Sequence, residues 1–137
     1  MMLIDEINAA NVFQINSEEF IRALHSMKRN KENEIMAIKK KIERYEEKRR
    51  QEEAMYRSLS PLKKLFTSRT PSHHQAVAYM VNVKERLKSI SSIKQSIALL
   101  DKLISDVHSE QSKEEMYLSR LLLEEIKTWK EAEVNEQ

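Results

Sequence analysis

The chain has 137 residues, of which 34% are charged, and its formal net charge is only +2. It contains neither glycine nor cysteine. P-loops, dinucleotide-binding turns, EF-hand loops and nucleophile elbows need glycine at fixed positions, so the sequence excludes all of them. Without cysteine there is no disulfide or thiol chemistry. No apolar run approaches the roughly 20 residues of a membrane-spanning helix, and we expect a single helical domain over residues 1–137, located in the cytoplasm.

Residues 1–16 form the only stretch of mixed character, and their first apolar residues predict a short helix. Asn16 and Glu19 then have the spacing of a capping box, so a long helix is expected to begin directly after Asn16. This first long helix extends over residues 17–59, because the residue before Pro61 is driven out of the helical conformation. The apolar residues that predict the short helix are Met2, Leu3, Ile4 and Ile7.

A basic reversal over residues 60–71 separates the first long helix from a second one. Thr70 followed by Pro71 is a suitable N-cap and first helical residue, so the second long helix is expected over residues 72–108. Apolar residues in both helices recur at spacings of three and four, as they do in a coiled coil. In the second helix these residues are Met80, Val83, Leu87, Ile90, Ile93, Ile97, Leu100, Ile104 and Val107.

The two long helices are expected to lie antiparallel. With the reversal centred near Leu65, facing residues have numbers that add to about 130. This register sets apolar patches opposite one another, because Ile35 and Ile38 face Ile93 and Ile97, while Ile21 and Leu24 face Leu103 and Val107. The sequence therefore predicts an all-α fold, a long antiparallel helical hairpin that resembles a coiled coil.

A third, C-terminal helix, or a continuation of the second one, is predicted over residues 112–134. Ser112 and Glu115 have the spacing of another capping box, which favours a break and a restart there. In the predicted register this helix extends past the start of the first one, so a hairpin alone would leave its apolar side bare. Two alternatives stay open: the helix closes a bundle within the chain, or its apolar side binds a partner, which includes a second copy in a dimer. We call this side the apolar stripe, and it consists of Leu118, Leu122, Ile126 and Trp129.

The middle of the chain contains no acidic residue from Ala54 to Lys84. Cations in this segment can contact the phosphates of a nucleic acid, an anionic membrane or an acidic protein surface. Lysines near a helix end also stabilise its C-terminal dipole. A nucleic-acid site normally uses a longer basic stripe and a domain pI above about 9, so a structural or protein-docking role is favoured. The basic tip is defined as Arg57, Lys63, Lys64, Arg69, His73 and His74.

Metal binding and catalysis have little support in the sequence. His73 and His74 are adjacent, but no cysteine and no nearby carboxylate complete a set of zinc ligands. His25 and His108 face one another in the predicted register, far from the first pair. No spacing of Ser, His and Asp singles out a catalytic triad. We therefore predict no metal, no cofactor and no enzyme activity.

The function predicted from these features is a non-enzymatic protein–protein interaction module: an adaptor, an escort or chaperone, or a regulator. It would present its helical faces to a protein partner that the sequence does not identify. In this hypothesis the apolar stripe anchors the partner and the basic tip steers an acidic surface. The alternative is a nucleic-acid-binding protein that uses the basic tip, residues 57–74.

Overall fold

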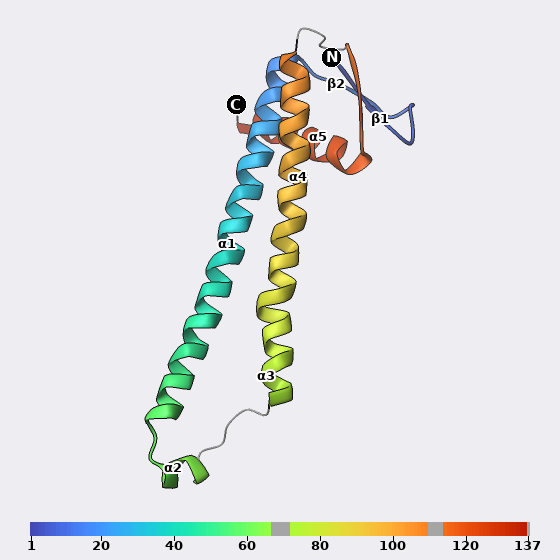
Figure 1. Ribbon diagram of the computed structural model, residues 1–137. Helices are drawn as coiled ribbons and strands as arrows, with labels where there is room; N and C mark the ends of the chain where they lie inside the picture. The colour runs from blue at the N-terminus through green and yellow to red at the C-terminus, as the bar shows by residue number, and fades with distance from the viewer. Residues whose placement is uncertain (67–71, 110–113, 137) are drawn as a thin grey trace. The chain divides into compact units, whose positions relative to one another are not determined.

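The computed structural model describes residues 1–66, 72–109 and 114–136, and Figure 1 draws its helices and strands. The chain divides into two compact units. Unit 1 consists of Met1–Lys31 and Ser96–Gln137, and unit 2 consists of Glu32–Gln95. Helix α1 (Ser17–Ser58) packs against helix α4 (Glu85–His108), and most of the chain is helical, which confirms the predicted all-α class. Whether the two units make one domain stays a prediction.

Helix α1 begins where its capping box predicts. The backbone N–H of Glu19 donates to Oδ1 of Asn16 at 2.7 Å, and Nδ2 of Asn16 donates to the carboxylate of Glu19. The first bond satisfies a backbone donor that the first helical turn leaves without an intrahelical acceptor, and the second joins the two side chains. The helix ends at Ser58, shortly before Pro61, as the proline predicts.

Replacing Asn16 by alanine should lower the free energy of unfolding by about 1 kcal/mol, because the variant loses the N-cap acceptor of α1. Asn30 provides the matched control, since it is exposed inside the same helix. Asn30→Ala should leave stability unchanged or raise it slightly, because alanine is the better helix former. Urea denaturation followed by circular dichroism measures both variants. Equal effects of the two substitutions would contradict a capping role for Asn16.

Unit 2 contains the end of α1, a short helix α2 (Pro61–Phe66), helix α3 (Ser72–Tyr79) and the start of α4. A π-helical turn, Met80–Lys84, joins α3 to α4, so the predicted helix over residues 72–108 is confirmed. The π-helical turn was not predicted. The buried side chains of this unit come from the apolar seams of both long helices: Ile35, Ile42, Val83 and Ile90.

The antiparallel register is close to the predicted one in each unit taken by itself. In unit 1 the expected position opposite Lys28 is residue 102, and Nζ of Lys28 lies 2.8 Å from Oδ1 of the neighbouring Asp101. In unit 2 the expected position opposite Arg49 is residue 81, and the guanidinium carbon of Arg49 lies 5.5 Å from the ring centroid of the nearby Tyr79.

Among the helices of the described residues, none is long and apolar enough to cross a membrane.

Unit 1 contains a three-stranded sheet that was not predicted. Strand β1 (Met2–Asp5) pairs antiparallel with β2 (Val12–Gln14) and parallel with β3 (Glu115–Leu118), in the order β2-β1-β3. The short N-terminal helix predicted from the first apolar residues is therefore wrong, because those residues form β1. The predicted start of the C-terminal helix at Ser112 is also wrong: α5 extends over Arg120–Glu136.

Side chains on the sheet alternate between an inner face and an outer face, as strand geometry requires. The register places Leu3, Phe13 and Met116 side by side on the inner face, which packs on the core. It also places Ile4, Val12 and Tyr117 side by side on the outer face. Ile4 is buried in the middle of that face, while Val12 and Tyr117 on the flanking strands are exposed.

The core of unit 1 answers the question that the apolar stripe left open. The stripe packs in cis, because Leu118, Leu122 and Ile126 are all buried in this core. Trp129 is partly buried against the same core, and its ring centroid lies 5.8 Å from the guanidinium carbon of Arg22. The hypothesis that this stripe anchors a partner is therefore corrected, since its side chains already fill the interior. The other large side chains of the core include Leu3, Phe20, Leu24, Leu100 and Leu123.

Candidate functional site

The basic tip is only partly described by the structure. Nε of Arg57 lies 3.8 Å from a carboxylate oxygen of Glu53, one helical turn earlier, and Nζ of Lys64 lies 5.5 Å from the ring centroid of Tyr56. Arg69 and the side chain of His73 lie outside the described residues. Lys63 and His74 are exposed. The nucleic-acid alternative stays a prediction, because the described part of the tip brings no larger cationic cluster together.

The histidines form no metal site in the part of the chain that the structure describes. There, no three His, Asp or Glu side chains lie close enough together to hold a metal ion. His25 and His108 are both exposed.

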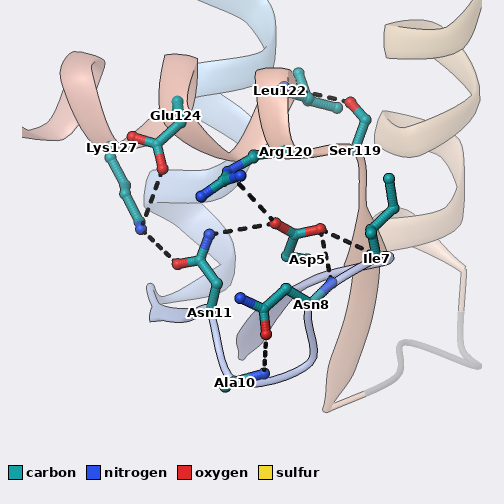
Figure 2. A network of polar contacts seen from close by, with 10 residues as sticks. All are labelled: Asp5, Ile7, Asn8, Ala10, Asn11, Ser119, Arg120, Leu122, Glu124 and Lys127. Carbon is teal, nitrogen blue, oxygen red and sulfur yellow. Dashed lines mark hydrogen bonds and ion pairs between the residues drawn. The ribbon is translucent and has the colours of Figure 1, made fainter.

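Asp5 is the buried charged residue of unit 1, with only 1% of its surface exposed. Figure 2 shows that its carboxylate lies at the centre of a polar network. Oδ1 accepts hydrogen bonds from the backbone N–H groups of Ile7 at 2.9 Å and Asn8 at 3.2 Å. Oδ2 accepts one from Nδ2 of Asn11 at 3.4 Å and lies 3.9 Å from Nε of Arg120. These bonds close the turn between β1 and β2.

The same network connects the turn to α5. Nζ of Lys127 donates to Oδ1 of Asn11 at 3.0 Å, and Arg120 approaches Asp5 from the first turn of the helix (Figure 2). The hydrogen bond from Ile7 lowers the pKa of Asp5, and the bonds from Asn8 and Asn11 lower it further, although burial acts in the opposite direction. The carboxylate of Asp5 thus joins the turn between β1 and β2 to the start of α5.

A groove lies in unit 1 between the C-terminal part of α4 and the strand β3, and has a volume of about 960 Å³. One wall is a single face of α4, made by Leu99, Lys102, Leu103 and Asp106. The opposite wall is the strand, with Glu115, Met116 and Tyr117. Leu99 and Tyr117 are 51% and 60% exposed, so both walls present apolar surface to solvent.

The strand wall of this groove is an open edge of the sheet. In the part of the chain that the structure describes, β3 pairs only with β1. The N–H groups of Met2 and Glu6 donate to the carbonyl oxygens of Glu114 and Leu118, at 2.8 and 2.9 Å. Backbone groups in a strand point alternately to its two sides. The N–H and C=O groups of Glu115 and Tyr117 consequently point away from β1. Among the described residues, no backbone hydrogen bond satisfies them across this edge.

The groove carries an excess of negative charge. Among the described residues, Asp106, Glu114 and Glu115 line it together with one cation, Lys102. Within the described part of the chain, none of the three carboxylates has an ion-pair partner. A partner group of positive charge would therefore meet carboxylates that no described cation of the chain pairs with.

Sequence reasoning did not find this groove. The sequence pattern places its residues at the end of one helix and the start of another, because Glu115 has the capping-box spacing from Ser112. The alternation of Glu115, Met116, Tyr117 and Leu118 is a weak signal for a strand, since it spans only four residues.

Comparison with protein-family models, with curated proteins and with solved structures finds no match to this chain.

Proposed function

We propose that this chain is a non-enzymatic protein–protein interaction module, and that a segment of its partner binds in the groove between α4 and β3. The open edge of β3 is the observation that carries the proposal. An unpaired strand edge beside a groove is a known mode of peptide recognition, in which main-chain hydrogen bonds supply affinity and side-chain pockets supply specificity. A role as adaptor, escort or regulator in the cytoplasm belongs to the same proposal.

The exposed apolar side chains of the groove support the proposal. Leu99 and Tyr117 come from opposite walls, and each has more than half of its surface exposed. Leu103 also lines the groove and is buried in the core of unit 1, so this part of the lining is held by the core. Aromatic and aliphatic side chains around such a base are typical anchors for a partner. Because helix α4 forms one wall of the groove, the bound partner would contact a helical face, as the sequence predicts.

Random peptides displayed on phage and selected on the full chain should yield ligands for the groove. Their affinity, measured by fluorescence polarisation, should fall about tenfold when Leu99 and Tyr117 are both replaced by alanine. The double variant should stay folded, because substitutions of exposed side chains rarely change stability by more than about 0.5 kcal/mol.

Leu121→Ala is the matched control for this experiment. Leu121 is a leucine with 73% of its surface exposed, on α5, and it does not line the groove. Its replacement should leave peptide binding unchanged. Selected peptides that bind the double variant and the wild type equally well would show that they bind elsewhere, and the proposal would then be wrong.

A further inference from the structure

We infer that the segment bound in this groove is an extended strand that pairs with the open edge of β3 and alternates apolar and basic side chains. This inference rests on the proposed function and specifies the chemistry of the partner.

The unpaired backbone groups of β3 suit the addition of another strand. Glu115 and Tyr117 direct their N–H and C=O groups into the groove, and these groups repeat at every second residue, as a pairing strand requires. β3 has four residues, which span about 13 Å at roughly 3.3 Å per residue. A partner segment of about four to six residues therefore pairs with the whole edge, and the sheet extends to a fourth strand.

The two faces of the sheet determine which side chains the added strand places next to the core. A strand added beside β3 must place its own side chains alternately on the inner and outer faces. On the inner side they lie next to Met116, with Leu99 and Leu103 of α4 on the facing wall. Apolar side chains thus lie on both sides of the added strand, and Lys102 and Asp106 share the wall of α4 with them. Every second side chain of the partner is accordingly aliphatic.

The carboxylates of the groove determine the charge of the other side chains of the added strand. On the outer face, side chains of the added strand lie next to Glu115 and Tyr117, which share that face with Ile4. Opposite charges on neighbouring strands stabilise their pairing, whereas like charges destabilise it. An arginine or lysine also interacts favourably with the ring of Tyr117. The carboxylates of Glu114 and Asp106 line other parts of the same groove and add to its negative charge. The intervening side chains of the partner are therefore basic.

Synthetic heptapeptides test this pattern against the full chain by fluorescence polarisation. A capped peptide that alternates valine and lysine should bind at least about tenfold more tightly than one that alternates valine and glutamate. A third peptide with the same valines and lysines arranged in two blocks is the control for charge alone. It should bind more weakly than the alternating peptide, because it cannot separate the two side-chain types onto opposite faces.

Backbone methylation tests whether the bound peptide pairs as a strand. Two versions of the alternating peptide carry N-methyl groups on alternate amides, one set for each edge of the strand. Pairing with β3 through one edge predicts that one version loses binding and the other keeps it. The version that loses binding also identifies the direction of the added strand, because the side-chain faces are fixed by the groove.

A charge reversal in the protein completes the test. Glu115→Lys should remove the preference for the basic alternating peptide, because two carboxylates, Asp106 and Glu114, would then be matched by two lysines in the groove. Glu131→Lys is the matched control, since Glu131 is an exposed glutamate on α5 that does not line the groove. This variant should keep the preference of the wild type.

The remaining outcomes separate this inference from the proposed function. Equal binding of the alternating and block peptides overturns the inference, and so does binding that survives both sets of N-methyl groups. Peptides selected from the phage library that require Leu99 and Tyr117, but share no apolar–basic alternation, overturn the inference and leave the proposed function standing. A dimer of the free chain that the Glu115→Lys substitution dissociates identifies a second copy as the occupant, which also overturns the inference.

Discussion

Replacing Leu123 by alanine should lower the free energy of unfolding by about 2–5 kcal/mol, the range for leucine truncations in protein cores. Leu123 lies on α5 and has none of its surface exposed. The substitution removes buried methyl groups and leaves a cavity that the surrounding side chains fill only partly. Such a loss is a large fraction of the stability of a typical small domain.

Leu121 is the matched control for this prediction. It lies on the same helix, is also a leucine, and has 73% of its surface exposed. Leu121→Ala should change the free energy of unfolding by no more than about 0.5 kcal/mol. Urea denaturation followed by circular dichroism measures both variants. If the two substitutions had equal effects, α5 would not pack in cis, and the apolar stripe would be available to a partner after all.

Local signals explain why the helix ends could be predicted. The capping box at Asn16 and the restriction imposed by Pro61 each act within a few residues, so the sequence pattern contains all the information needed. The helical hairpin follows from the same kind of information. Two apolar seams of similar length, separated by one proline-bracketed reversal, have few other ways to bury themselves.

The sheet could not be predicted in this way because its pairing is not local. β1 pairs with β3 across most of the length of the chain, and each strand has only four residues. An apolar run as short as Met2–Ile4 fits one turn of a helix as well as it fits a strand. The decision is made by tertiary partners, and periodicity does not identify them.

The candidate site could not be predicted for the same reason. The groove exists only once β3 lies beside α4, and its open edge exists only because β3 pairs with β1 on one side. The excess of acidic residues near the C-terminus is visible in the sequence. The three carboxylates of the groove, however, belong to separate places: Asp106 lies on α4, Glu114 lies just before β3, and Glu115 lies in β3. For the apolar stripe, in contrast, the sequence leaves two alternatives: packing within the chain or binding a partner. The burial of its side chains in unit 1 decides for the first.

Replacing Asp5 by asparagine should destabilise the chain at neutral pH. One carboxylate oxygen would become an NH₂ group, and whichever oxygen it replaces, a donor would then face donors of Asn11 and Arg120 or the backbone N–H groups of Ile7 and Asn8. A buried donor without an acceptor is costly, and the charge that attracts Arg120 would also be lost. Asp106→Asn is the matched control. Asp106 is exposed and has no ion-pair partner among the described residues, so its replacement should change stability little.

The pH dependence of the Asp5→Asn effect provides the sharper test. Because folding lowers the pKa of Asp5 below its ordinary value of 3.8, the folded state binds this proton less readily than the unfolded state. The stabilisation by the carboxylate is therefore complete above that value and is lost as the pH falls through it toward the lower pKa of the folded state. Urea denaturation at a series of pH values should show wild type and variant approaching one another below about pH 4. A stability difference that stayed constant down to pH 2 would mean that the ionised form of Asp5 does not hold the turn onto α5.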